Sequence, residues 1–444
     1  MIIPVSFRYH NKIHCMYDPV CRNKENIMKN RLLILGSLDE FVLLVQLARQ
    51  RGIYTIVCDG YHNSPAKRAA DIAYDIPVTN IDEIAALCRS EHVDGIITSF
   101  SDLLFECMVK IADKAHLKCY LTPDKLCYYR DKTQMKTMFQ TLGIPSPKFT
   151  CLEKDFSDEA LAGFHFPVVV KPIDKYGSRG VFVLDSIQRI RERFDECCAS
   201  SDVKNILVEE YHDGHEFNMM TWVLDGKVQV ISIADREKTS ISKEDIPIST
   251  RNVYPSRLMK QVEAQATDIL QRIVDYTGQR DGALSMQFFW SAKKGLSVCE
   301  VAGRFLGYEH ELIELSSNLC LEQILLDYVY DEASLRKSLL HHNPHMKRCS
   351  AVLYFHGKEL TIAHQEIARE IAERNEVVFS QIFYQDGETV VQHGPNPYVV
   401  RYYITADSRE ALDQVTEEIF HQISITTEDG TEILYPNQIT SYDN

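Results

Sequence analysis

The stretch of sequence that decides the fold runs Phe166-Pro-Val-Val-Val-Lys171-Pro172, then Asp174-Lys-Tyr-Gly177-Ser178-Arg-Gly180, then Val181-Phe-Val-Leu184. Two β runs joined by a glycine-containing loop predict a hairpin. The lysine at the end of the first run supplies a positive charge, and glycine amides can approach phosphate oxygens closely. The loop alone also fits an ordinary hairpin turn, and no Gly-Lys-Ser/Thr closes it as in a P-loop.

A second polar stretch, Ile206-Leu-Val-Glu209-Glu210-Tyr211, leads through Gly214 to Glu216. The pattern predicts a strand that ends in a linker, after which the chain re-enters a strand at Glu216. Exposed backbone in such a linker can bond a purine edge, and a nearby carboxylate can accept hydrogen bonds from ribose hydroxyls. Acidic residues at solvent-facing strand ends would give the same pattern, so both interpretations stay open at this point.

A third set of polar residues, Gln287, Glu300 and Arg304, belongs to a predicted hairpin over residues 282–290 and 296–301. Strands joined by a tight turn can present Gln287 and Glu300 on the same side, and both offer the hard oxygen atoms that Mg²⁺ prefers. Arg304 could brace a transferred phosphoryl group or a substrate carboxylate through two N–H groups. A surface hairpin with incidental polar residues is the alternative, although a glutamate in so apolar a strand needs a partner.

The N-terminal part alternates short apolar strands with amphipathic helices, which predicts a parallel, doubly wound sheet. Strands are expected at residues 31–36, 54–59, 72–76 and 93–98, and helices at 40–51 and 81–90. A nicotinamide-binding dehydrogenase is the rival interpretation of such a unit. The dehydrogenase interpretation is weakened because the turn Gly36-Ser-Leu-Asp-Glu40 lacks the second and third glycines of G-x-G-x-x-G. Asp59 is then the single residue that matches the dinucleotide-binding pattern.

Four domains or segments are expected along the chain: an extension at 1–29, an α/β domain at 30–122, a central domain at 123–345 with a subdomain at about 150–212, and a small α+β domain at 346–444. The last boundary falls at His341-His-Asn-Pro-His345. The α+β domain is expected to hold strands at 349–355, 377–384, 389–391 and 398–404, with helices at 363–374 and 408–422.

Composition excludes several classes of protein. The 444 residues carry a net charge of −15, which disfavours nucleic-acid binding because no basic stripe compensates for it. No apolar run approaches the ~18 residues that cross a bilayer, so no membrane partner is expected. The 13 cysteines are irregularly spaced, which is typical of free thiols in a reducing compartment. Without a signal-peptide pattern at the N-terminus, we expect a cytoplasmic protein.

Taken in order from about residue 31, these stretches resemble the ATP-grasp superfamily, with carbamoyl-phosphate synthetase large subunits, biotin carboxylase and carboxylate–amine ligases as the nearest subfamilies. The resemblance implies a Rossmann-like pre-ATP-grasp domain, an ATP-grasp domain with a mobile lid over residues 174–180, and the small C-terminal domain. It implies that ATP contacts Lys132, Lys171, Gly177, Ser178, Gly180, Glu209, Glu210, Tyr211 and Glu216, and that Mg²⁺, or Mn²⁺ in its place, binds Gln287 and Glu300. Lys171 and Arg304 take the catalytic roles.

The activity that the resemblance implies is an ATP- and Mg²⁺-dependent carboxylate–amine or related C–N ligase, with small-molecule carboxylate and amine substrates and an acyl-phosphate intermediate. One departure matters: the family reads Glu-x-Asn-x-Arg where this chain has Glu300-Val-Ala302-Gly-Arg304. An ATP-binding module with little turnover is therefore the alternative function. We expect the stretch at 234–257 to form the substrate wall, where the basic groups Arg236, Lys238 and Arg251 could hold a carboxylate; a solvated loop fits the same stretch equally well. A homodimer is compatible with the family.

The lid over residues 174–180 holds few apolar side chains, so it should open easily in the free protein and become protected when ATP binds. We expect Gly180→Val to impair closure over the phosphates more than it impairs folding.

Overall fold

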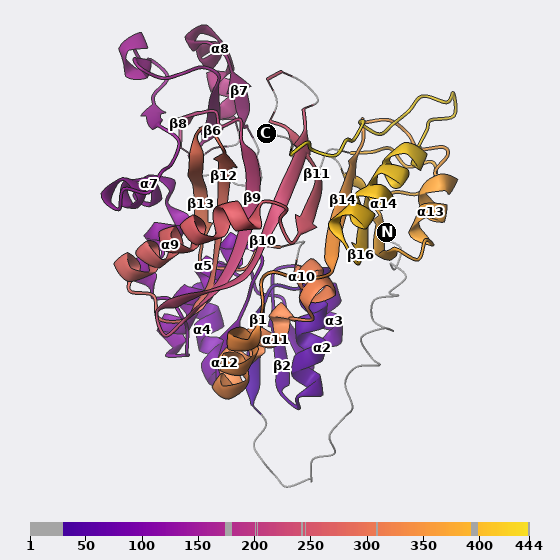
Figure 1. Ribbon diagram of the computed structural model, residues 1–444. Coiled ribbons are helices and arrows are strands. Elements are labelled where there is room, and N and C mark those ends of the chain that lie inside the picture. The colour runs from indigo at the N-terminus through magenta and orange to yellow at the C-terminus, as the bar shows by residue number, and fades with distance from the viewer. Residues whose placement is uncertain are drawn as a thin grey trace.

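A computed structural model of the chain describes residues 30–173, 180–199, 201, 203–240, 243–244, 246–307, 310–391 and 398–442. The expected N-terminal extension and the lid positions Gly177 and Ser178 lie outside the described residues. Three sheets organise the described chain, with four, eight and four strands. Figure 1 places the first sheet at the bottom, the central sheet above it, the small third sheet at the top and the C-terminal strands to the right. No helix among the described residues is long and apolar enough to cross a membrane.

The first sheet is parallel, in the order β3-β2-β1-β4. Its strands are β1 (Arg31–Leu35), β2 (Tyr54–Cys58), β3 (Ile72–Tyr74) and β4 (Gly95–Ile97). The helices of this unit are α2 (Val42–Gln50), α3 (Pro65–Ala69), α4 (Ile81–Ser90) and α5 (Asp102–Ala115), with a 3-10 turn, η1 (Asp39–Phe41), ahead of α2. The expectation of a parallel α/β unit is confirmed. Its carboxyl edge, where α/β proteins bind ligands, carries the turns after β1 and β4.

The central sheet is antiparallel and runs β13-β12-β9-β10-β11-β14-β16-β15. Its strands are β9 (His215–Leu224), β10 (Lys227–Thr239), β11 (Ile248–Tyr254), β12 (Gly282–Ser291), β13 (Gly295–Ala302), β14 (Cys349–His356), β15 (Val377–Ile382) and β16 (Tyr398–Ala406). The β9–β10 turn has Asp225 at φ 53° and Gly226 at φ 76°. Two successive positive φ angles define a type I′ turn, which favours Asp-Gly and matches the twist of the hairpin. The helices that accompany this sheet before β14 are α9 (Met259–Thr277), α10 (His310–Ser317), α11 (Leu321–Tyr330) and α12 (Glu332–His341).

The small sheet contains the hairpin predicted from the opening stretch. Its order is β5-β8-β6-β7, with β5 (Phe149–Leu152), β6 (Val168–Pro172), β7 (Phe182–Leu184) and β8 (Ile206–Glu210). The strands β6 and β7 pair antiparallel, and α8 (Ile187–Cys197) packs on them. Gly180 has φ +67°, and a Cβ built there would lie 2.8 Å from the carbonyl oxygen of Cys197. A valine at Gly180 would therefore clash with the end of α8, so Gly180→Val is expected to disturb the packing of α8 on the small sheet as well as closure over the phosphates.

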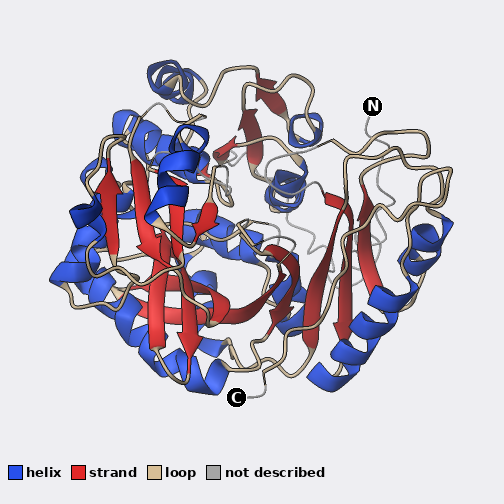
Figure 2. Cartoon of the chain, turned by 90° about the horizontal axis from the view of Figure 1, so that it is seen from above, coloured by secondary structure: helices blue, strands red, loops and turns tan. Residues whose placement is uncertain are grey.

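The C-terminal strands β14, β16 and β15 continue the central sheet, although they pack into a hydrophobic core of their own. Figure 2 shows helices covering the outer side of these strands; they are α13 (Glu366–Ala372) and α14 (Arg409–Gln422). The strand expected at 389–391 is wrong. Among the described residues, Thr389 makes only an isolated bridge to Thr361. The remaining expected elements form within a few residues of the bounds expected for them.

A buried histidine joins the first unit to the helices that follow β13. His310 begins α10, and its ring stacks on Phe100 at 4.4 Å between centroids. Its Nδ1 lies 2.6 Å from a Glu322 carboxylate oxygen, and its Nε2 lies 3.2 Å from one of Glu311. Burial lowers the pKa of His310, but Glu311 and Glu322 outweigh it and raise the pKa to about 9. The imidazolium is therefore the folded-state form at neutral pH.

This raised pKa predicts a loss of stability in alkali. The unfolded side chain titrates near 6.5, so the contribution of His310 is complete below that pH and disappears as the pH rises through about 9. We expect the free energy of unfolding to fall by about 3 kcal/mol over this window, measured by urea denaturation. In His310→Gln the slope between pH 6.5 and 9 should flatten. An equal slope in both proteins would contradict the assignment.

Candidate active site

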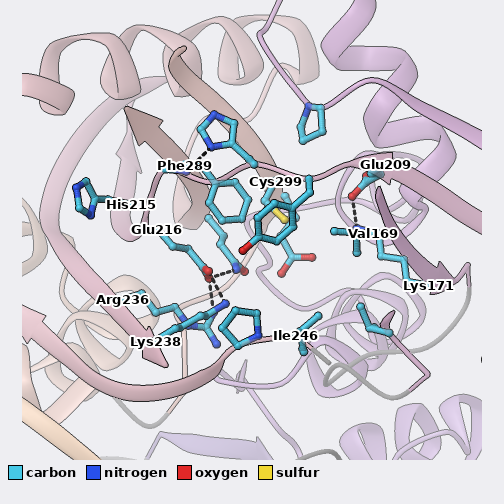
Figure 3. A pocket seen from close by; sticks show the side chains of 18 of the residues that line it. Val169, Lys171, Glu209, His215, Glu216, Arg236, Lys238, Ile246, Phe289 and Cys299 are labelled. Atoms are coloured by element: carbon cyan, nitrogen blue, oxygen red, sulfur yellow. Dashed lines mark hydrogen bonds and ion pairs between the residues drawn. The ribbon is translucent and has the colours of Figure 1, made fainter. Parts of the chain in front are cut away.

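A cavity of about 620 Å³ lies between the small sheet and the central sheet. Figure 3 shows side chains from both sheets converging on it. The expected site residues that line it are Lys132, Lys171, Glu209, Glu210, Tyr211, Glu216, Gln287, Glu300 and Arg304. Gly180 does not line it, since it sits beside α8. The fold therefore brings together expected site residues that are far apart in the sequence, from Lys132 to Arg304.

A buried carboxylate between two lysines forms one side of the cavity. Glu209 on β8 forms two ion pairs: one carboxylate oxygen lies 2.5 Å from Lys171 Nζ on β6, and the other lies 3.0 Å from Lys136 Nζ. Burial acts to raise the pKa of Glu209, but the two lysines overcome it and lower the pKa to about 2. Burial opposes the charge of Lys171 as well, and Glu209 nevertheless raises its pKa. The set of Lys171, Lys136 and Glu209 carries a net positive charge that faces the cavity through Lys171.

Helix α7 (Lys132–Thr141) supplies the other lysines of this side. Asp131 caps the helix by accepting from the backbone N–H groups of Thr133 and Gln134, as expected for a residue that opens a helix. Lys132 and Lys136 are one turn apart and therefore lie on one face. Burial and the nearby Lys171 lower the pKa of Lys132. An anion beside Lys132 and Lys171 would relieve this repulsion, which favours a phosphate at this end of the cavity.

A second buried carboxylate, Glu216 at the start of β9, lies at the other end. Lys238 Nζ forms an ion pair with it, and Arg236 Nη1 lies 3.3 Å away. Gln287 Nε2 donates to the same carboxylate at 2.5 Å. Burial acts to raise the pKa of Glu216, and Lys238 and Arg236 reverse this so that the net pKa is lowered. Figure 3 shows Glu216, Arg236 and Lys238 pointing toward one another across β9 and β10.

The β12–β13 hairpin holds the two expected metal ligands opposite each other, since Gln287 pairs in register with Glu300. Glu300 is exposed toward the cavity, and the donation from Gln287 Nε2 to Glu216 leaves the amide oxygen of Gln287 as an acceptor. Mg²⁺ in nucleotide sites needs one or two carboxylates, with phosphates and water completing the shell, so this donor set fits it. No cluster of three or more His, Cys, Asp or Glu ligands occurs among the described residues. Glu300 is the carboxylate on which such a site depends, because Ala302 offers no donor.

Arg304 is held by a residue of the first unit. Its Nε and Nη2 donate to the two carboxylate oxygens of Asp102 at 2.8 and 2.6 Å. Asp102 is the first residue of α5, at the carboxyl edge of the first sheet. Arg130 lies 3.8 Å from the same carboxylate and also lines the cavity. The two-point geometry fixes the plane of the Arg304 guanidinium where the first unit meets the β12–β13 hairpin.

Aromatic side chains flank the linker between β8 and β9. The ring of His212 stacks on Phe289 at 5.3 Å between centroids, and both line the cavity beside Tyr211. Gly214 lies so close to the backbone of Trp290 that a Cβ would come within 2.5 Å of its carbonyl oxygen. Glycine therefore lets the linker approach β12. Flat apolar rings beside exposed backbone suit a heterocyclic base.

One basic residue of the expected substrate wall is not available. Arg251 is fully buried, with its guanidinium paired to Glu237 at 2.7 Å and to Asp413 at 2.7 Å. Its expected role as a carboxylate holder is therefore wrong, because its charge is already compensated inside the sheet. Arg236 and Lys238 do line the cavity, but they face Glu216.

The sequence interpretation missed Lys136, Asp102, Phe289, His212 and Tyr442, all of which line the cavity or support its charges. Lys136 carried a signal, since it follows Lys132 by four positions on one helix face. Asp102 also carried one, because it follows a strand of the parallel sheet. The sequence around Tyr442 held no such signal, because only the tertiary structure brings this residue to β9.

The fold and site define a class of protein with a cleft between two sheets, lined by paired basic and acidic side chains, and a carboxylate-bearing hairpin at its edge. A family model for the ATP-grasp domain matches residues 164–310, so the chain carries an ATP-grasp domain, and the resemblance expected from the sequence is confirmed. A formate-dependent phosphoribosylglycinamide formyltransferase of Erythrobacter litoralis is 24% identical over 58% of this chain and 67% of its own length. Several further curated formyltransferases are matched over only about half of their length, for example 50% for that of Mycobacteroides abscessus.

Other similarities extend along most of the chain. A carbamoyl-phosphate synthase of Methanobrevibacter smithii is 24% identical over 88% of this chain and 100% of its own length. The crystal structure of an L-amino acid ligase from Bacillus licheniformis superposes with a TM-score of 0.73, at 19% identity, over 91% of this chain and 100% of its own. The biotin carboxylase domain of a 2-oxoglutarate carboxylase from Hydrogenobacter thermophilus, solved with MgADP, superposes with a TM-score of 0.68, at 14% identity, over 92% of each chain. These likenesses show the ATP-grasp ligase fold.

Proposed function

We propose that the chain is an ATP- and Mg²⁺-dependent ligase that joins a small-molecule carboxylate to an amine. The observation that carries the proposal is the cavity itself, in which Lys132, Lys171 and the exposed Glu300 converge from separate elements. The identified relatives include C–N ligases, and the fold is shared with proteins solved with MgADP. An amino acid is the substrate class that the similarity to an L-amino acid ligase supports.

The proposed reaction proceeds in two steps. An oxygen of the substrate carboxylate attacks the γ-phosphorus of ATP, the bond to ADP breaks, and an acyl phosphate forms. The amine then attacks the acyl carbon, loses a proton, and expels inorganic phosphate that keeps the oxygen from the carboxylate. Mg²⁺, held by Glu300 and Gln287, supplies charge neutralisation at the phosphates.

The residues of the chain act mainly by position and charge. Lys132 and Lys171 attract the phosphates, and the pairing of Lys171 with Glu209 fixes its ammonium. Glu216 can accept hydrogen bonds from the ribose hydroxyls of ATP. The adenine base would lie beside the rings of Tyr211, His212 and Phe289. Arg304, oriented by Asp102, lines the same cavity and would contact the transferred phosphoryl group.

Asp102 gives a prediction for this arrangement. Asp102→Asn keeps the shape but removes the charge that holds Arg304 in its two-point geometry. We expect kcat for acceptor-dependent ADP release to fall about ten- to a hundredfold while the KM for ATP changes by less than about twofold. Steady-state kinetics checks this. Glu366→Gln, an exposed carboxylate on α13, is the control and should behave as wild type. A rise in the KM for ATP with kcat unchanged would contradict the role.

The test of the proposed function is ADP release in the presence of Mg²⁺ and pools of amino acids and other small carboxylates and amines. We expect release to rise above the ATP-only background for at least one pool, and Lys171→Ala to abolish the rise. ADP release that no acceptor stimulates across a broad panel would contradict the ligase proposal.

One observation favours a second candidate, a nucleotide-binding module with little turnover. Ala302 stands where the family pattern has a ligand, so the metal shell depends on Glu300, Gln287 and water. This candidate predicts ADP binding by calorimetry with background hydrolysis only. The variant Ala302→Asn distinguishes the two candidate functions. If the new asparagine raises Mg²⁺ affinity and turnover appears, the native chain is the nucleotide-binding module with little turnover. Acceptor-stimulated turnover in the native chain would exclude it.

A further inference from the structure

Residues 435–442 leave the C-terminal strands and run toward β11, as the yellow chain in Figure 1 shows. The Tyr435 N–H donates to the His356 carbonyl at 2.9 Å, and Asn437 Nδ2 donates to the Tyr354 carbonyl at 2.8 Å. The segment is thus tied to β14 before it crosses β11. Thr440 and Tyr442 then line the cavity.

Tyr442 contacts the residues on both sides of the buried Glu216 site. Its ring stacks on His215 with the centroids 4.7 Å apart and the planes at 18°. Its hydroxyl donates to Glu237 Oε1 at 2.9 Å, and the Thr440 N–H donates to Glu237 Oε2 at 3.1 Å. His215 precedes Glu216 on β9, and Glu237 precedes Lys238, the ion-pair partner of Glu216, on β10.

Glu237 does not need Tyr442 to balance its charge. It is 1% exposed at its side chain and pairs with Arg251 at 2.7 Å and with Arg409 at 3.0 Å. Arg409 also pairs with Asp235, so a buried ionic network fixes the C-terminal end of β10. Loss of the tyrosine would therefore leave no uncompensated buried charge. Its effect should fall on the cavity wall, where the ring is.

We propose that Tyr442 is a positioning residue of the nucleotide site. Its ring closes the cavity beside Glu216, and its hydroxyl donates to Glu237, the neighbour of Lys238 on β10. The part of the nucleotide next to it would be the ribose and its attached phosphates, because Glu216 accepts from hydroxyls and Lys238 is cationic. The inference rests on the proposed function, since it needs a nucleotide in this cavity.

The test is calorimetric titration of ADP with Mg²⁺ into the full chain and three variants. We expect Tyr442→Ala to raise the Kd about tenfold, because the stacked wall and one hydrogen bond are lost. Tyr442→Phe keeps the ring and should stay within about threefold of wild type. Gln438→Ala, an exposed residue of the same segment that does not line the cavity, should bind as wild type. Without nucleotide, the midpoint of thermal unfolding should stay at the wild-type value in Gln438→Ala and should fall only slightly in Tyr442→Ala, which loses one ring contact and one hydrogen bond.

Each outcome decides the inference. Unchanged binding by Tyr442→Ala would overturn it, as would an equal loss in Gln438→Ala, since that would indicate general loosening of the segment. A wild-type chain that binds no ADP would remove the proposed function and this inference together, whereas the variant results concern the inference alone. Hydrogen exchange on the unmodified chain covers the case in which Tyr442→Ala does not fold. Exchange at residues 437–442 should slow when ADP binds, and unchanged exchange would overturn the inference.

Discussion

Glu300→Ala is expected to lower acceptor-dependent ADP release by about a hundred- to a thousandfold. Glu300 is exposed to the cavity and faces Gln287 across the hairpin, and Ala302 supplies no further ligand atom. Removing the one charged donor from a metal shell that already lacks another leaves the phosphate charge poorly compensated in the transition state. Steady-state kinetics at saturating ATP measures the effect.

The control for this prediction separates metal binding from nucleotide binding. ADP affinity measured without Mg²⁺ should not weaken in Glu300→Ala, because the carboxylate repels phosphates when no metal is between them. Addition of Mg²⁺ should tighten ADP binding in wild type and have little effect in the variant. Full turnover in Glu300→Ala would exclude Glu300 as the metal ligand.

Glu209→Gln is expected to lower the free energy of unfolding by about 3–5 kcal/mol, the cost of leaving buried charges unpaired. Lys136 is 2% exposed at its side chain and Lys171 16%, and Glu209 is the carboxylate with which both lysines pair. Urea denaturation at pH 7 measures the loss. Glu210→Gln on the next position of β8 is the matched control, since Glu210 contacts the exposed His165 and should cost less than about 1 kcal/mol.

The same cluster predicts a direction for acid sensitivity. The pKa of Glu209 is lowered from 4.5 to about 2, so its contribution is complete above pH 4.5 and is lost as the pH falls toward 2. In Glu209→Gln this part of the acid dependence should vanish. The double variant Glu209→Gln/Lys136→Met should regain part of the lost stability, because one unpaired cation is removed. A single variant as stable as wild type would show that the lysines do not depend on Glu209.

Local pattern was enough to predict most elements that position the site. The runs at Val168–Pro172 and Phe182–Leu184 predicted a hairpin that forms, and the Asp225-Gly226 turn places β9 beside β10. In each case the deciding information lies within about twenty residues: hydrophobic alternation, turn chemistry or a helix cap. The ordered motif set then supplied the family resemblance, which one hairpin alone could not.

Long-range pairing accounts for what the sequence could not predict. Arg251 appeared to be a free basic group, yet β11 places it beside Glu237 and α14 places Asp413 beside it. Arg304 and Asp102 are 202 positions apart, and Tyr442 meets His215 across an even longer separation. Such partners are set by how the sheets pack, so a single sequence gives the residue type but not the contact. The strand expected at 389–391 is likewise decided by pairing, since Thr389 makes only an isolated bridge with Thr361.

The central claim is that the cavity uses ATP to activate a carboxylate as an acyl phosphate. The most direct measurement supplies an amino-acid mixture labelled with ¹⁸O in its carboxyl groups, together with ATP and Mg²⁺, and analyses the released inorganic phosphate by mass spectrometry. The account predicts that one ¹⁸O atom passes from the carboxylate to each phosphate released by ligation. Phosphate that carries no ¹⁸O while ADP accumulates would mean that water attacks ATP directly, and it would contradict the account.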